Sequence, residues 1–179
     1  MSYNIESHIH LFSSWAASRA TSVKNNRFKV AVGQKILNKS AIKNIILNPD
    51  LLPNSENKFD ETHRIWRKDI IKYAKEEWFT FTHWVSAKLI NIYLKSIIIC
   101  GGFHTHPSAK YIHPPIDSVL LKKLSSINFN EKGKFWRQSD KIAWSKFNSL
   151  EYEKVIKEIK NGLENEPLWT IEKYWKGYQ

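Results

Sequence analysis

Apolar residues recur at helical spacing along most of the chain, and no segment shows the strict alternation that marks a half-buried strand. The first helical pattern runs from about 7 to 22. The second runs from about 30 to 47 and breaks near 38–40, where Ser40 is suited to cap a new helix. A loop rich in turn residues follows at 48–57. The residues expected on the inner side of the first helix are Ile9, Phe12, Trp15, Ala16 and Ala20.

The middle of the chain carries the strongest helical patterns. Asp60 is expected to cap a helix that ends near Glu77, and a connector at 79–84 separates it from a helical block at 86–100. Gly101 and Gly102 are expected to end that block, because glycine readily takes the backbone conformation of a helix stop. The inner face of the helix that follows Asp60 is expected to hold Ile65, Trp66, Ile70, Tyr73 and Ala74.

Helical patterns also fill most of the last third of the chain. Pro114 and Pro115 are expected to begin a helix that reaches about 124. Asn148 and Glu151 have capping-box spacing, which predicts a helix to about 162, and a last helix is expected from about 167. The basic stretch 131–141 is interpreted as an excursion between helices. About six to nine helices result, which indicates one compact all-α domain covering 1–179.

Length and composition agree with a single folded unit. The chain has 179 residues, of which 42% are apolar, and its single cysteine excludes an intramolecular disulfide framework. The first residues lack the basic and apolar regions of a secretion signal, and the longest apolar stretches are far too short to span a membrane. We therefore expect a cytoplasmic protein without a membrane partner. No obligatory protein partner is evident.

The charge balance suggests a polyanionic partner. The chain has 28 Lys and Arg against 17 Asp and Glu, a formal net charge of +11, which favours nucleic acid as the partner. Only five of the basic residues are Arg, so part of the excess can equally reflect a lysine-rich composition and a solvated surface.

Lys88 is the first candidate for chemistry. On a helix it shares one face with Asn91 and Lys95, whereas apolar residues cover the other faces. It is expected in the first turn, where the helix dipole disfavours a cation and lowers the pKa of the amine. A lowered pKa is the condition that an amine nucleophile needs. The alternative is an ordinary surface lysine.

Asp117 is expected at about the third position of the helix begun by Pro114 and Pro115, where free amides and the dipole favour a carboxylate. A carboxylate near a neutral amine can stabilise the positive charge that develops when the amine attacks. A helix carboxylate without any function is the alternative.

At these residues the sequence resembles the helix-hairpin-helix superfamily of DNA glycosylases, particularly its 8-oxoguanine branch. Ala87–Asn91 resembles the start of the second hairpin helix with its Lys, and Pro115–Asp117 resembles the Pro-hydrophobic-Asp element that follows. The match covers roughly 60 to 125. It implies a small helical enzyme that turns a damaged or modified base, of the 8-oxoguanine type, out of DNA and breaks its glycosidic bond.

The resemblance also implies the roles of the two residues. Lys88 would attack C1′ of the sugar and form a Schiff base, and Asp117 would help to deprotonate it and stabilise the transition state. An AP-lyase step could follow at the abasic site. The scheme requires no cofactor and no metal.

The hairpin departs from the family pattern, because family members usually have glycines whose amides approach a phosphate, and this chain has Thr82–Ser86 there, with Trp84 in place of a glycine. The candidates for contact with DNA or the base are Trp15, Thr82, His83, Trp84, Ser86, Asn91, His113, Lys122 and Lys123. Further candidates for stacking on the base are Phe12 and the terminal cluster Trp169, Tyr174, Trp175 and Tyr178. Other basic residues that can contact phosphates are Lys132, Lys134 and Arg137.

Potential zinc ligands also cluster within 14 positions around the glycine stop: Cys100, His104, His106 and His113. Their spacing matches no strong zinc signature, so we expect no metal site, and His113 is expected to orient the Asp117 turn instead.

Two other functions stay open on the sequence alone. One is a non-catalytic module on the same fold, which binds nucleic acid or acts in host–phage conflict. The other is a protein-interaction domain whose charge is compositional.

Overall fold

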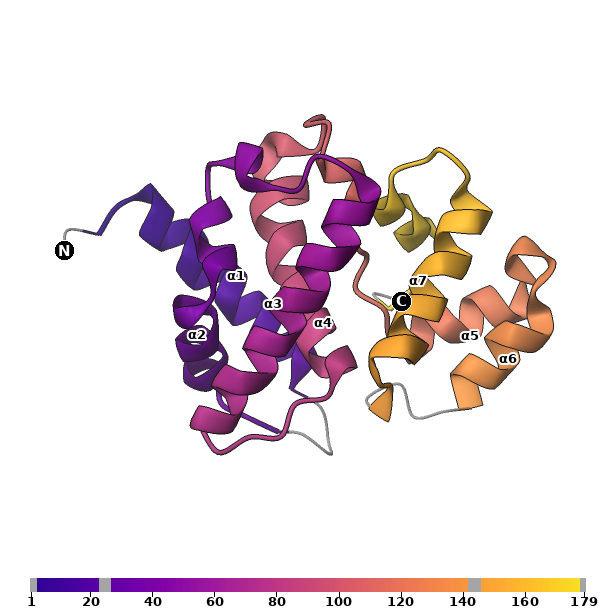
Figure 1. Ribbon diagram of the computed structural model, residues 1–179, viewed down its shortest axis with the longest axis horizontal. Helices are drawn as coiled ribbons and strands as arrows, with labels where there is room; N and C mark the ends of the chain where they lie inside the picture. The colour runs from indigo at the N-terminus through magenta and orange to yellow at the C-terminus, as the bar shows by residue number, and fades with distance from the viewer. Residues whose placement is uncertain (1–2, 23–26, 142–145, 178–179) are drawn as a thin grey trace.

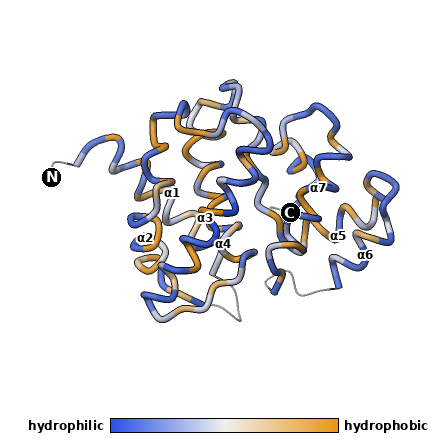
Figure 2. The backbone as a smooth tube through the Cα atoms, viewed as in Figure 1, coloured by the Kyte–Doolittle hydropathy of each residue, from blue (hydrophilic) through white to orange (hydrophobic). Residues whose placement is uncertain are grey.

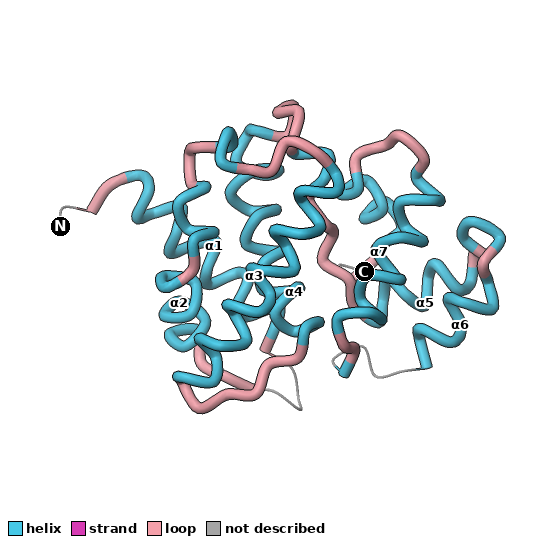
Figure 3. Tube along the Cα trace, in the orientation of Figure 1, coloured by secondary structure: helices cyan, strands magenta, loops and turns pink. Residues whose placement is uncertain are grey.

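The computed structural model describes residues 3–22, 27–141 and 146–177, and the described part consists of helices and loops without a strand (Figure 3). The all-α class expected from the hydrophobic periodicity is therefore confirmed. The α-helices are α1 (Ile5–Thr21), α2 (Val30–Lys39), α3 (Glu56–Glu76), α4 (His83–Leu94), α5 (Ser118–Ser126), α6 (Gly133–Lys141) and α7 (Ser149–Leu163). The shorter helices are η1 (Ala41–Ile45), η2 (Pro49–Leu51), η3 (Lys95–Phe103), η4 (Ala109–Tyr111), η5 (Phe129–Glu131) and η7 (Leu168–Tyr174).

The helices form two lobes that meet along α4 (Figure 1). One apolar cluster is built from α1, α2, α3 and most of α4 and η3. The other is built from α5, α6, α7 and η7, and it takes Trp84 and Ala87 from the first turns of α4. In both lobes apolar and polar stretches alternate along the helices (Figure 2). Helix α4 is therefore the element that the two cores share.

Helix α4 is apolar on nearly all its faces because neighbours surround it. It continues without a break into the π-helix η3, whose helical backbone is interrupted at Gly102, where φ is 93°. Among the described residues, the stretch His83–Phe103 alone is long and apolar enough to cross a membrane. It is 61% buried inside the protein over its most apolar window, as a core helix is.

The inner face of α1 differs from the predicted one. Phe12 and Trp15 are 61% and 48% exposed. The residues that face the core are mostly small or polar: His10, Ser13, Ser14, Ala17, Ser18 and Thr21. Small side chains let α1 approach α2 so closely that a Cβ at Gly33 would collide with the Ser18 side chain. The prediction was wrong because it followed the largest apolar residues and not the face that permits close packing.

Helix α3 begins earlier than predicted, at Glu56, and Asp60 lies inside it instead of capping it. Ile65, expected on the inner face, is 58% exposed. Its place is taken by the polar residues His63 and Arg67, which continue the spacing of the buried Phe59, Trp66 and Ile70.

In the last third of the chain, two elements differ from the prediction and one predicted cap is confirmed. Asp117 is the N-cap of α5 and precedes its first turn, because Pro114 and Pro115 lie in an extended segment. The stretch interpreted as an excursion forms α6. The capping box of Asn148 and Glu151 at the start of α7 is confirmed.

Candidate active site

The structure brings Lys88 and Asp117 together at the junction of the two lobes. The Lys88 Nζ lies 3.8 Å from Oδ2 of Asp117, although 29 positions separate the residues in the chain. The chain reverses at Gly102 and returns as an extended segment that ends at Asp117. The pair therefore depends on the whole connection between α4 and α5.

Lys88 is only 8% exposed. It lies in the second turn of α4, between Ala87, which belongs to one apolar cluster, and Leu89, which belongs to the other. Burial lowers the pKa of the Lys88 amine below its ordinary value of 10.5, and the Asp117 carboxylate partly offsets this by raising it. The lowering of this pKa agrees with the expectation from sequence. Its cause, however, is loss of solvation and not a position in the first turn of the helix.

The Asp117 carboxylate is held in a fixed orientation. Its Oδ1 accepts hydrogen bonds from the backbone amides of Val119 and Leu120, at 3.0 and 3.1 Å, as an N-cap does. The indole Nε1 of Trp175 lies 3.2 and 3.1 Å from the two carboxylate oxygens and donates to them. Three donors therefore aim the carboxylate toward Lys88.

A second ion pair lies along the same side of α4. Lys95, two turns after Lys88, pairs with Glu172 of η7. Burial raises the pKa of Glu172, and the negative charge of Asp117 adds to the rise, whereas Lys95 opposes it. The Asp117 carboxylate therefore interacts electrostatically with Glu172. The two ion pairs form one charged cluster between α4, α5 and η7. No motif in the sequence singled out Glu172.

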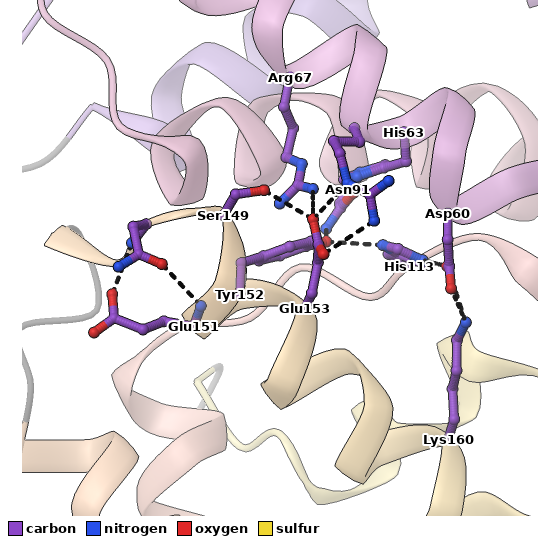
Figure 4. A network of polar contacts seen from close by, with 12 residues as sticks. Asp60, His63, Arg67, Asn91, His113, Ser149, Glu151, Tyr152, Glu153 and Lys160 are labelled. Carbon is purple, nitrogen blue, oxygen red and sulfur yellow. Dashed lines mark hydrogen bonds and ion pairs between the residues drawn. The ribbon is translucent and has the colours of Figure 1, made fainter. Parts of the chain in front are cut away.

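A buried polar network holds the extended segment before Asp117 against α4 (Figure 4). The side chain of Asn91, one turn after Lys88, donates to the carbonyl of Pro114 at 2.9 Å and to the Tyr152 hydroxyl at 3.1 Å. The same hydroxyl lies 2.9 Å from Nδ1 of His113. Asn91 also bonds His63, through an Oδ1–Nε2 contact of 2.8 Å. These bonds fix the position from which the chain enters Asp117.

The network extends to charged residues that join α3 to α7 (Figure 4). Arg64 and Arg67 both bind the carboxylate of Glu153, at distances from 2.7 to 3.0 Å. Although burial alone would raise it, hydrogen bonds from Arg64, Ser149 and Arg67 lower the pKa of Glu153 to about 2. The guanidinium carbon of Arg67 lies 4.5 Å from the centre of the Tyr152 ring. The two lobes are therefore held together by ion pairs beside the site.

A cavity of about 360 Å³ opens between α3 and α7 on this side. Asp60 and Lys160 line it and pair with each other at 2.7 Å, and Nε2 of His113 lies 2.9 Å from Asp60. Burial lowers the pKa of His113, and Asp60 partly offsets this. Most of the charged groups that line the cavity pair with one another, and we assign it a structural role.

The other predicted contact residues fall into two groups. Trp84, Ser86, Asn91 and His113 are buried, and Thr82 caps α4 by accepting a hydrogen bond from the Val85 amide. His83 is half-buried at the start of α4, and Trp15, Lys122 and Lys123 lie at or near the surface. Contact of any of them with DNA stays a prediction. Of the candidates for stacking, Trp175 is the one that touches Asp117, and Tyr178 lies outside the described residues.

Cys100 and the three histidines that follow the glycine stop do not form a metal-binding group. Among residues 3–22, 27–141 and 146–177, no group of three or more His, Cys, Asp or Glu is placed to hold a metal ion. His113 is engaged with Tyr152 and Asp60, and His106 lies 3.1 Å from Asp50.

The chain matches no protein-family model, no curated protein and no solved structure.

Proposed function

We propose that the protein is a DNA glycosylase that removes a damaged or modified base, with Lys88 as nucleophile and Asp117 as its electrostatic partner. The observation that carries the proposal is the buried Lys88–Asp117 pair at 3.8 Å. A buried amine with a lowered pKa, facing a carboxylate in fixed orientation, is the arrangement that amine nucleophiles use. The net charge of +11 supports a polyanionic substrate.

In this reaction the neutral Lys88 amine attacks C1′ of the deoxyribose, and a C–N bond forms while the glycosidic bond breaks. The base leaves with the bonding electrons and takes up a proton. The new bond makes the Lys88 nitrogen cationic, and the nearby Asp117 carboxylate stabilises that charge. Loss of a proton and opening of the sugar ring give an imine, from which elimination of the 3′ phosphate would cut the strand.

The substrate class follows from the resemblance at Ala87–Asn91 and in the Pro115–Asp117 element, which favours a purine lesion of the 8-oxoguanine type. Base recognition would require the nucleotide to leave the duplex, because Lys88 is only 8% exposed and lies beneath the surface. We place the activity in the cytoplasm, in base-excision repair.

Release of free base tests the proposal. The purified protein is incubated with duplexes that carry 8-oxoguanine, uracil or an alkylated base, and base release and strand cleavage are followed separately. We expect the wild type to release one class of base and Lys88→Gln to lose the activity by at least 100-fold. Lys154→Gln, which removes an exposed lysine of α7, is the matched control and keeps the activity.

Binding of duplex DNA without release of base from any of the duplexes would contradict a glycosylase. It would favour a non-catalytic nucleic-acid-binding module, including one that acts in host–phage conflict.

A further inference from the structure

Trp78 combines two properties that rarely occur together in an aromatic residue. Its side chain is 95% exposed, the largest exposure among the apolar residues of the described chain. Its φ is 65°, in the left-handed region that favours glycine. It lies in the loop between α3 and α4, the connection that leads to Lys88.

The backbone around Trp78 forms the usual end of a helix, in which glycine would be expected. The amide of Phe79 donates to the carbonyl of Ala74 at 2.9 Å, and the amide of Trp78 donates to the carbonyl of Lys75 at 3.0 Å. These two bonds define a Schellman motif with Trp78 at its left-handed position. Glycine is favoured there because it has no Cβ, so a tryptophan costs stability at this position.

No packing of the indole offsets this cost, since the side chain is almost completely exposed. A strained conformation that nothing in the fold compensates points to a function for the side chain.

The loop that carries Trp78 is anchored. Phe79 and Phe81 flank the ring of Phe28, with ring centres 6.1 and 5.0 Å from it. Phe28 and Phe81 are buried, so the segment 27–29 and the α3–α4 loop are joined through aromatic packing at the lower edge of the view in Figure 3. Trp78 is therefore presented on a rigid support, which reduces the entropy lost when it binds a partner.

Basic side chains are exposed on the segments that precede Trp78 in the chain or pack against its loop. Arg27 and Lys29 are exposed on either side of Phe28, and Lys75 is exposed in the last turn of α3. Glu76 and Glu77, which would oppose this charge, are paired with Lys39 and Lys35 of α2. Exposed aromatic rings on surfaces that also carry exposed cations are the combination that binds nucleic-acid strands, because bases stack on the rings and the cations contact phosphates.

We propose that Trp78 stacks on an unpaired nucleobase of the bound strand. This inference rests on the proposed action on DNA, and it adds a contact on the α3–α4 loop, away from the Lys88–Asp117 pair. Stacking tolerates any base, because every base presents an aromatic face. The contact would favour DNA in which a base has lost its pairing partner over fully paired duplex.

The test compares Trp78→Gly with the wild type by fluorescence anisotropy on three probes: a single strand, a duplex with a one-base bulge, and the fully paired duplex. Glycine suits the left-handed position, so this variant folds. We expect its affinity for the single strand and the bulge to fall about 10-fold and its affinity for the paired duplex to change little. Trp78→Phe restores most of the loss, and Tyr3→Ala, which removes another exposed aromatic, has no effect.

Two further readouts separate stacking from a general loss of binding. A 2-aminopurine placed in the bulge is quenched by the wild type and not by Trp78→Gly. The slope of affinity against salt concentration stays the same in the variant, because no phosphate contact is lost.

Equal affinity of Trp78→Gly and wild type for the single strand and the bulge would overturn the stacking role, even if lesion bases are still released. Absence of nucleic-acid binding by the wild type would overturn both this inference and the proposed function. Trp78-dependent binding to phosphatidylglycerol vesicles, with no effect on DNA, would assign the ring to a membrane surface instead.

Discussion

Burial of the Lys88 amine reduces the stability of the folded protein, and this loss suggests that the lysine has a functional role. Its amine is buried between two apolar clusters, where loss of solvation lowers its pKa and Asp117 compensates only in part. Buried ion pairs seldom add stability compared with apolar residues of similar volume. Residues that reduce stability are often retained where they serve activity.

Replacement of this lysine is therefore expected to separate stability from activity. Lys88→Met keeps the volume of the side chain and removes the buried charge, so the free energy of unfolding at pH 7 should rise by about 1 kcal/mol. Base release should be lost. Urea denaturation measures the first quantity, and a clear loss of stability in the variant would show that the lysine serves the fold.

Trp78 leads to a second expectation at the level of one residue. Trp78→Gly relieves a left-handed φ of 65°, so the free energy of unfolding should rise by about 1 kcal/mol. Thermal unfolding of the variant beside Tyr3→Ala provides the measurement. A lower melting temperature than that of the wild type would mean that the indole makes contacts that stabilise the folded protein.

Among the elements, the segment that enters α5 decides whether the site is assembled. Asn91 of α4 holds it by donating to the Pro114 carbonyl, and it also bonds Tyr152 and His63. Asn91→Ala removes all three bonds and takes this partner from the Pro114 carbonyl and from Nε2 of His63, so stability should fall by about 2 kcal/mol. Single-turnover base release should fall as well, because Asp117 loses its fixed position. His104→Gln is the matched control, since His104 is an exposed residue of the same connection.

Local sequence signals predicted many of these elements. The spacing of apolar residues located α1, α2 and α4, and the capping box of Asn148 and Glu151 located the start of α7. The same signals failed where packing decides. Phe12 and Trp15 lie outside because only small side chains fit between α1 and α2, and His63 and Arg67 lie inside because they bond residues from α4 and α7. Those partners lie far apart in the sequence, so no local pattern reveals them.

In the candidate site too, some residues could be predicted from the sequence and others could not. The order of Lys88, a glycine stop and Asp117 allowed the pair to be proposed, and the structure places the two side chains 3.8 Å apart. Glu172 and the role of Trp175 were not predictable, because η7 reaches the site only through the packing of the second lobe.

At the scale of the whole molecule, α4 links two apolar cores, and buried histidines lie where the lobes meet. Burial lowers the pKa of both His63 and His113 below the ordinary value of 6.5, that of His63 strongly. The neutral forms of both histidines are favoured in the folded protein. At pH values below 6.5 the unfolded chain therefore binds more protons than the folded protein does. Stability should therefore fall as the pH drops below 6.5.

The measurement is the free energy of unfolding between pH 7 and pH 5. Each fully buried histidine contributes a slope of at most about 1.4 kcal/mol per pH unit. His63→Gln should flatten the profile, whereas the exposed His104→Gln should leave it unchanged. A profile with the same slope in His63→Gln and wild type would contradict the assignment of a buried neutral His63.

The central claim is that Lys88 forms a covalent bond to the sugar of its substrate, and borohydride trapping tests it most directly. A lesion duplex is incubated with the protein and sodium borohydride, and the trapped complex is digested and mapped by mass spectrometry. The account predicts a reduced adduct on the peptide that contains Lys88, and no adduct with Lys88→Gln. An adduct on another lysine, or base release that persists in Lys88→Gln without any adduct, would contradict it.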